Sequence, residues 1–293
     1  MDFELTEELS MLQQTAREFA AKELKAKARD MDKAETFDRS VFARMGELGL
    51  TAITIPDKYG GAGFCENKMA NQAACVTLEE INRWCASTGV TLSVHMSLFS
   101  SLLSKWGNEE QKARVLPRMA SGEWMGAYCL SEAGSGTDAG ALVCEAVKDG
   151  SDYVLNGSKL WITSAPYADV FIVFARTNKE HKTHGISAFI VEAATRGVTI
   201  GKQEKKMGIR GSATCEVLFN NCRVPATCRI GEEGKGFTIA LDTLDGGRIG
   251  IAAQAVGIGR GSMEDATEYS KTRQQFGKPI SSIDSGFEAR ALL

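Results

Sequence analysis

The stretch VCEAVKDGSDYVLNGSKLWIT at residues 143–163 decides the fold class of this chain. Apolar and polar residues alternate over 143–147 and again over 153–155, and an Asp-Gly pair at 149–150 separates the two runs. An Asn-Gly pair at 156–157 then precedes the β-rich run LWIT. Both pairs accept the positive φ angles that tight hairpins need. The stretch therefore predicts a meander of short strands with a turn at each pair.

Helical patterns flank this β-rich stretch on both sides. Residues 1–121 carry apolar residues at three- and four-residue spacing, with Thr6 as the expected N-cap of the first helix. Further short β-rich runs lie within 122–230, and a long Ala- and Gly-rich helical segment reaches about residue 273. We predict an α+β fold with an N-terminal helical domain (1–121), a middle β domain (122–230) and an incomplete C-terminal helical domain (231–293).

Several segments of the first domain carry local signals. A helix is expected from about residue 40 and another over 66–85. Asn108, with Gln111 three residues later, resembles a capping box at the start of a further helix. Residues 90–98 alternate strictly between apolar and polar, which fits a strand, but helical spacing follows directly. Periodicity leaves this segment open between strand and helix.

Composition excludes several classes of function. Of the 293 residues 43% are hydrophobic and 24% charged, with a net charge of −3, so no nucleic-acid or anionic-membrane partner is expected. No run approaches the ~18–20 apolar residues of a membrane span, and the acidic N-terminus predicts a cytoplasmic protein. None of the eight cysteines forms a Cys-x-x-Cys pair, and His181 and His184 lack further ligands nearby, so no metal site is expected.

The most informative stretch for chemistry is YCLSEAGSGTDAGA at 128–141, where small residues, hydroxyls and two acids would let the backbone approach a flat or phosphorylated ligand closely. Its glycines have the wrong spacing for a dinucleotide-binding fingerprint, and no strand-turn-helix unit surrounds them. The segment GEEGKGF at 231–237 lacks the spacing and the Ser or Thr of a phosphate-binding loop, so it is interpreted as a glycine-rich turn.

Five stretches in order carry a specific resemblance: CLSEAGSGTDAGA at 129–141, WITS at 161–164, KMGIRGSATCEVLF at 206–219, LDGGRIGIAAQAVGI at 244–258 and RQQFGKPIS at 273–281. They resemble the motifs of the acyl-CoA dehydrogenase family. The resemblance extends from about residue 3 to residue 281. It implies the helical, β and helical domains predicted above, FAD as the cofactor, and a homotetramer.

The resemblance also implies roles for individual residues. Two groups of positions match the family's flavin site: Tyr128, Cys129, Leu130, Ser131, Gly136 and Thr137 in the first motif or directly before it, and Trp161, Ile162 and Thr163 in the second. Thr137, Asp245 and Arg248 match substrate-side positions. Arg273 and Gln275 match a loop that reaches the FAD of a neighbouring subunit, where the donors of an arginine suit a diphosphate. Glu132 and Asp138 are expected to be structural hydrogen-bonding acids.

The implied reaction is the α,β-dehydrogenation of an acyl-CoA thioester, as in fatty acid β-oxidation, with electrons passing to an electron-transfer flavoprotein. The LDGGRIGIAAQA run is most similar to members that act on short straight chains such as butyryl-CoA. In most members the catalytic glutamate lies beyond residue 293, and in some it occupies the position of Gly247, so no catalytic residue is assigned. After Ile283 the sequence departs from the family, with Asp284 where glutamine is common, and we expect a truncation or a frame change near residue 283.

Two other interpretations stay open at this point. A flavin-dependent oxidase or monooxygenase of the same fold would use oxygen as the acceptor. A non-catalytic fragment that binds FAD or acyl-CoA would explain the missing carboxylate.

Overall fold

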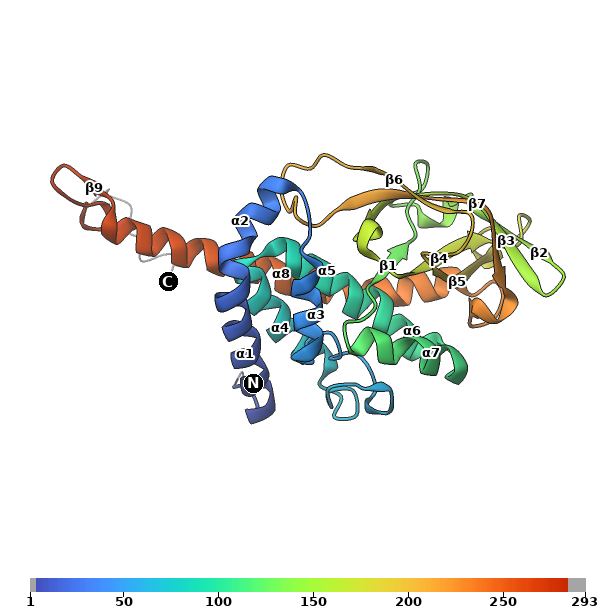
Figure 1. Cartoon of the computed structure of the whole chain (residues 1–293), viewed down its shortest axis with the longest axis horizontal. Helices are drawn as coiled ribbons and strands as arrows, with labels where there is room; N and C mark the ends of the chain where they lie inside the picture. Colours follow the sequence, from blue (N-terminus) through green and yellow to red (C-terminus); the bar gives the residue numbers. More distant parts are fainter. Residues whose placement is uncertain (1–3, 284–293) are drawn as a thin grey trace.

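The computed structural model describes residues 4–283, so Asp284 lies outside the described part of the chain. The architecture is α+β, as predicted, with a helical body, a sheet at one end and one long helix that runs past both (Figure 1). The helices that precede the sheet are α1 (Glu7–Phe19), α2 (Lys25–Ala34), α3 (Arg39–Glu47), α4 (Ala70–Trp84), α5 (Ala86–Ser93), α6 (Ser101–Trp106) and α7 (Glu109–Ala120), with wider π-helical turns η1 (Ala20–Leu24) and η3 (Val94–Ser100).

The predicted helix starts are confirmed where a side chain caps the backbone. The hydroxyl of Thr6 accepts a hydrogen bond from the backbone N–H of Leu9 at 3.3 Å. Asn108 and Gln111 form the complete capping box at the start of α7. The third expected helix begins later than predicted, at Ala70, after a stretch of turns.

Residues 90–98, which the sequence left open between strand and helix, lie in α5 and η3. This part of the chain is buried on nearly every side, including polar residues such as Thr91 and His95. A helix that is buried all round has no solvent face, so its sequence shows no amphipathic period. The alternation of apolar and polar residues therefore carried no information about strand structure here.

The sheet contains eight strands, ordered β6-β7-β3-β2-β4-β5-β8, with β1 pairing in parallel with β4. Successive side chains of a strand point to opposite faces. Because six consecutive residues of β4 are buried, both of its faces are covered. Ile172 and Phe174 pack toward the helices, whereas Phe171 and Val173 pack inside the curved sheet. The strands are β1 (Gly126–Cys129), β2 (Glu145–Asp149), β3 (Asp152–Thr163), β4 (Val170–Arg176), β5 (Ile186–Glu192), β6 (Val198–Gln203), β7 (Thr214–Pro225) and β8 (Arg229–Ile230).

One of the two predicted hairpin turns is confirmed and the other is wrong. β2 and β3 pair across a turn that contains Gly150, whose φ is 61°. At Asn156 and Gly157 the chain does not turn but continues as one strand, β3, with a β-bulge against β7. A Cβ on Gly157 would lie 2.8 Å from the Cα of Cys144, so the glycine is needed for close packing in the bulge.

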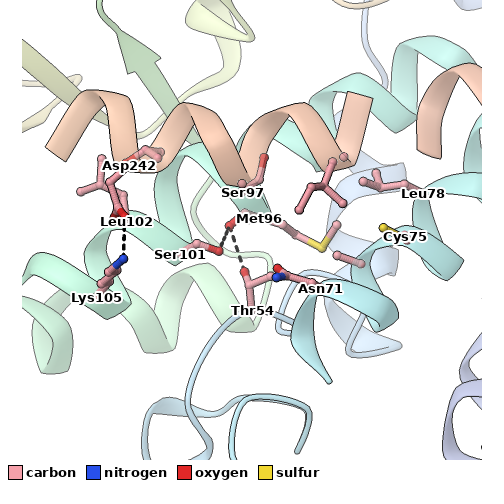
Figure 2. A pocket seen from close by; sticks show the side chains of 15 residues that line it. Thr54, Asn71, Cys75, Leu78, Met96, Ser97, Ser101, Leu102, Lys105 and Asp242 are labelled. Carbon is pink, nitrogen blue, oxygen red and sulfur yellow. Dashed lines mark hydrogen bonds and ion pairs between the residues drawn. The ribbon is translucent and has the colours of Figure 1, made fainter. Parts of the chain in front are cut away.

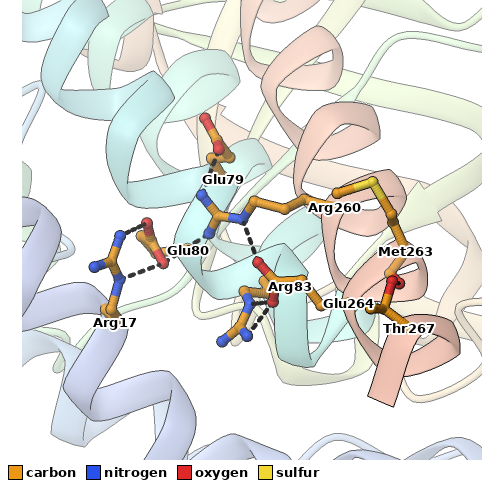
Figure 3. A network of polar contacts seen from close by, with 8 residues as sticks. All are labelled: Arg17, Glu79, Glu80, Arg83, Arg260, Met263, Glu264 and Thr267. Atoms are coloured by element: carbon orange, nitrogen blue, oxygen red, sulfur yellow. Dashed lines mark hydrogen bonds and ion pairs between the residues drawn. The ribbon is translucent and has the colours of Figure 1, made fainter. Parts of the chain in front are cut away.

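The predicted Ala- and Gly-rich helix is α8 (Gly236–Thr272), which ends at the short hairpin β9 (Gln274–Gln275) and β10 (Lys278–Pro279). Its glycines allow close helix contact, because Cβ atoms on Gly257 and Gly261 would each lie 2.4 Å from a backbone oxygen of α4. A polar network of α1, α4 and α8 lies beside this contact (Figure 3). No helix within residues 4–283 has both the length and the apolar character needed to cross a membrane.

Candidate functional site

The end of β1 and the end of β3 form the walls of a cavity of about 200 Å³, here called the aromatic cavity. Its lining contains six of the predicted flavin-site residues: Tyr128, Leu130, Ser131, Trp161, Ile162 and Thr163. Val94 and Leu98 of η3, Leu160 of β3 and Leu244 of α8 complete the lining. The structure therefore brings together two motifs that lie some thirty residues apart in the sequence.

Trp161 is presented to this cavity by an irregularity in β3. The pairing of β3 with β7 is interrupted between Lys159 and Ile162, and the backbone N–H of Leu160 instead donates to the carbonyl of Ser131 at 2.8 Å. Trp161 has a positive φ of 58° and is 58% exposed. A large aromatic residue with this backbone and this exposure is not a core-packing residue, and bulges of this kind re-aim side chains at functional sites.

The polar groups of the aromatic cavity are largely uncommitted. Within the described chain, the hydroxyls of Ser131 and Thr163 have no side-chain hydrogen-bond partner, although both residues line the cavity. The hydroxyl of Tyr128 lies 3.4 Å from the carbonyl oxygen of Ala240, and burial raises the pKa of this phenol. The cavity thus offers a flat indole, apolar walls and two hydroxyls that can donate to a ligand.

Cys129 differs from its neighbours Tyr128 and Leu130. Its side chain is fully buried on the other face of β1, among residues of the inner core of the sheet. Burial raises the pKa of this thiol. Because alternate residues of a strand point to opposite faces, only the backbone of Cys129 could contribute to the cavity.

A second cavity of about 280 Å³, here called the α8 cavity, adjoins the first and shares Val94, Leu98 and Leu244 with it. Gly247 and Arg248 line it from α8. The guanidinium of Arg248 is paired with the carboxylate of Asp245, and more than 70% of each side chain is exposed. These two predicted substrate-side residues therefore lie together at the surface beside the cavity.

A third cavity of about 260 Å³, here called the inner cavity, lies between α4, the η3–α6 segment and α8 (Figure 2). Ser97 lines both this cavity and the α8 cavity. At one side Asp242 accepts hydrogen bonds from Lys105 at 2.6 Å and from the indole of Trp106 at 2.8 Å. These bonds lower the pKa of the Asp242 carboxyl. This acid is therefore a charged, paired group.

The remaining predicted residues lie elsewhere. Gly136 and Thr137 are exposed in the loop after β1, and neither lines the aromatic cavity. Arg273 and Gln275 are exposed at the far end of α8, well away from the sheet (Figure 1). Residues 4–283 contain no cluster of three or more His, Cys, Asp or Glu side chains that could hold a metal ion.

Sequence reasoning missed the residues that η3 contributes. Val94 and Leu98 line both the aromatic and the α8 cavities, and Ser97 joins the α8 cavity to the inner one. Their four-residue spacing is a helical signal, but the strict alternation around them obscured it. Leu244 of α8 also lines both the aromatic and the α8 cavities and was not predicted. Its position in the LDGGR motif, next to the predicted substrate-side residue Asp245, was the signal that could have identified it.

Comparison with known proteins supports one family over nearly the whole chain. Residues 6–123 match the acyl-CoA dehydrogenase N-terminal domain, residues 127–222 the middle domain and residues 234–285 the C-terminal domain. A short-chain specific acyl-CoA dehydrogenase of Clostridium acetobutylicum is 46% identical over 96% of this chain and 73% of its own length. The human mitochondrial short-chain specific enzyme is 45% identical over 96% of this chain and 67% of its own.

Solved structures agree with this assignment. The butyryl-CoA dehydrogenase of Megasphaera elsdenii superposes with a TM-score of 0.93 at 42% identity, covering 97% of this chain and 74% of that one. A chain from work on the electron transferring flavoprotein of Acidaminococcus fermentans also gives 0.93, at 44% identity and with the same coverage. With three domain matches in order and identities above 40%, this chain belongs to the acyl-CoA dehydrogenase family.

Proposed function

We propose that this protein is an FAD-dependent oxidoreductase that catalyses the α,β-dehydrogenation of short-chain acyl-CoA thioesters and passes electrons to an electron-transfer flavoprotein. The observation that carries the proposal is the aromatic cavity, whose lining combines an exposed Trp161 with two uncommitted hydroxyls and which adjoins the α8 cavity. Relatives named for short-chain substrates and the neighbour named butyryl-CoA dehydrogenase support the substrate class. The neighbour chain from the electron transferring flavoprotein work supports the acceptor.

The residues of the aromatic cavity fit FAD. A neighbour from Bacillus anthracis, 36% identical to this chain, is described as complexed with FAD. When bound, FAD supplies the two-electron acceptor that side chains lack. Trp161 offers a flat apolar surface for a tricyclic ring, and Ser131 and Thr163 offer donors for its polar edge. Cβ atoms on Gly134 and Gly136 would meet no other atom within 4 Å, so this loop also leaves room for a ligand.

The α8 cavity is the proposed site for the acyl group. Its walls are mainly apolar, with Val94, Leu98 and Ile251 among them, so they exclude water from a short hydrocarbon chain. We propose that Arg248 at its edge meets an anionic part of the CoA moiety, as the resemblance implies. Neither the aromatic cavity nor the α8 cavity is lined by a carboxylate from the described residues. These residues account for binding and orientation, and we assign none of them the role of the base.

The oligomer is a separate proposal. We infer a homotetramer, in which Arg273 and Gln275 of one subunit contact the FAD of another. Support comes from the position of both residues, which are exposed in and beside β9 at the end of α8, far from strands β1 and β3 (Figure 1). Sedimentation of the purified protein with and without FAD tests this point.

The deciding experiment is to purify the chain, record its visible spectrum and add butyryl-CoA without oxygen. Bleaching of the flavin absorbance supports the complete dehydrogenase and shows that some group removes the α-proton. A spectral shift without bleaching supports binding of FAD and substrate without turnover. A protein without bound flavin, even after incubation with FAD, contradicts the proposal for this chain.

A second candidate, an oxidase, is favoured by one finding. The prolyl acyl carrier protein oxidase AnaB superposes with a TM-score of 0.87, although its identity is only 29%. Oxygen consumption with release of hydrogen peroxide, after reduction by an acyl-CoA, would favour the oxidase. Reoxidation by an electron-transfer flavoprotein without peroxide favours the dehydrogenase.

A further inference from the structure

Glu132 and Lys159 form an ion pair directly behind the aromatic cavity. The Nζ atom of Lys159 lies 2.6 Å from Oε1 of Glu132, and the two side chains are 0% and 5% exposed. The removal of two charges from water is costly, and a buried pair is stable only where further hydrogen bonds satisfy its atoms. Here the pair has those bonds, and they lead to the walls of the cavity.

The other hydrogen bonds of the pair join three segments of the middle domain. Lys159 donates a second bond, at 3.1 Å, to the carbonyl of Leu130 at the end of β1. Glu132 accepts bonds from the backbone N–H groups of Val143 at 2.6 Å and Cys144 at 3.0 Å. The pair thus ties the end of β1 to β3 and to the segment that enters β2.

Both charged residues are sequence neighbours of cavity residues. Ser131 lies between Leu130 and Glu132. Lys159 donates hydrogen bonds to both of these neighbours, to the carbonyl of Leu130 and to the carboxylate of Glu132. Trp161 follows Lys159 by two residues, and the intervening Leu160 donates to the carbonyl of Ser131. The positive φ of Trp161 is unfavourable by itself and persists only where its surroundings impose it. The bonds of Lys159 and Leu160 fix the backbone directly before Trp161.

We propose that Glu132 and Lys159 are positioning residues, which hold Ser131 and Trp161 in the geometry that binds the flavin ring. Neither charged side chain lines the aromatic cavity, so both act through their backbone neighbours. The inference rests on the proposed function, because it takes the ligand of the cavity to be FAD. It adds to that function the two residues on which the shape of the site depends.

The test uses the full chain and four variants. Lys159→Met removes the ammonium, Glu132→Gln keeps the shape of the acid, and the double variant removes both charges and leaves no unpaired carboxylate. Val224→Ala is the matched control, because it weakens the same sheet where β7 pairs with Tyr153, six residues along β3 from Lys159. Thermal unfolding, FAD affinity from flavin fluorescence and hydrogen exchange of the Leu160 amide are measured for each.

The double variant is expected to be more stable than Lys159→Met, since it buries no lone charge. Its FAD affinity nonetheless stays at least about tenfold weaker than that of the wild type, because a hydrogen bond to a charged group is lost behind the cavity. Its Leu160 amide exchanges faster than in Val224→Ala at matched stability. Glu132→Gln is the variant with the smallest change in shape. It too should bind FAD more weakly than the wild type and exchange its Leu160 amide faster.

The proposal is overturned if the double variant binds FAD as tightly as the wild type, or if its Leu160 amide stays as protected as in Val224→Ala. Failure of the proposed function is recognised separately, because then the wild type itself binds no FAD. In that case the amide exchange, which needs no flavin, still decides whether the pair positions Leu160 and Trp161. If Lys159→Met does not fold, Glu132→Gln and the double variant carry the comparison.

Discussion

The guanidinium of Arg260 in α8 lies 2.8 Å from the carboxylate of Glu80 in α4, whose side chain has no exposed surface. Arg17 of α1 binds the same carboxylate at 2.9 Å, and Arg260 also contacts Glu79 at 2.6 Å (Figure 3). Burial alone would raise the pKa of Glu80, but the hydrogen bonds from the two arginines outweigh it and the pKa lies below its ordinary value. Three helices that are distant in sequence are thus joined at one buried acid.

Replacement of Arg260 by methionine should therefore destabilise the protein by about 3 kcal/mol, since it leaves the buried Glu80 with a single partner. Urea unfolding at pH 7 measures the change. Lys271→Met on the same helix is the control, because Lys271 and Glu268 are both well exposed and such pairs contribute less than about 1 kcal/mol. Equal losses in the two variants would contradict a special role for Arg260.

The glycines of α8 provide a second prediction about the same contact. Gly257→Ala should destabilise the protein by about 1–3 kcal/mol, because the new Cβ would lie 2.4 Å from the backbone oxygen of Glu79 and the helices would have to separate. Gly259→Ala, two residues along the helix, meets no atom within 4 Å and should stabilise by up to about 1 kcal/mol through helix propensity. Opposite signs in thermal unfolding confirm the close contact, and the same sign refutes it.

His95 should make the protein sensitive to acid. Burial lowers the pKa of this histidine to about 4 in the folded protein, whereas an unfolded histidine has a pKa of about 6.5. The unfolded chain therefore binds the proton first, and stability falls as the pH is lowered from about 6.5 toward 4. His95→Leu should remove about 2 kcal/mol of the stability difference between pH 7 and pH 4.5.

The check for His95 is chemical unfolding over a series of pH values. Met96→Leu, at the neighbouring buried position, is the control, because it changes no titrating group and should shift the stability curve equally at every pH. If His95→Leu retains the slope of the wild type between pH 6.5 and 4.5, the histidine is not the source of the acid sensitivity.

Trp161 should matter for the ligand and not for the fold. Because its side chain is 58% exposed, Trp161→Ala should change the stability of the flavin-free protein by less than about 1 kcal/mol. Its FAD affinity should fall about tenfold or more, since base–aromatic and related stacking contributes about 1–3 kcal/mol. Trp161→Phe keeps an aromatic ring and should recover part of the affinity. If Trp161→Ala instead loses much stability and no FAD affinity, the side chain of Trp161 serves packing and not ligand binding.

Much of the site could be predicted from local sequence. The motif residues Ser131, Trp161 and Thr163 meet in one cavity, as their resemblance to the family implied. The role of Glu132 as a hydrogen-bonding acid of its loop was also predicted correctly, since it accepts two backbone N–H groups. The partner of Glu132 was not predicted, because nothing in the local sequence of Lys159 distinguishes a buried lysine from an exposed one.

The errors have a common physical origin. Asn156 and Gly157 have the residue types of a hairpin turn, yet the strand continues because Cys144 packs against Gly157 and the long strand β7 pairs on both sides of the bulge. Residues 90–98 have the alternation of a strand, yet they are helical because neighbouring elements bury them on nearly every side. In both places long-range packing overrode a local preference worth about 1 kcal/mol.

The sequence by itself determined the fold class, the helix starts at Thr6 and Asn108, and the family, because caps, turns and motifs depend on residues near one another in the chain. Only the tertiary structure decided which side chains share a cavity, that Cys129 points away from it, and that Lys159 is buried against Glu132. These features depend on contacts between segments distant in sequence, and their energies are set by burial, which no local pattern records.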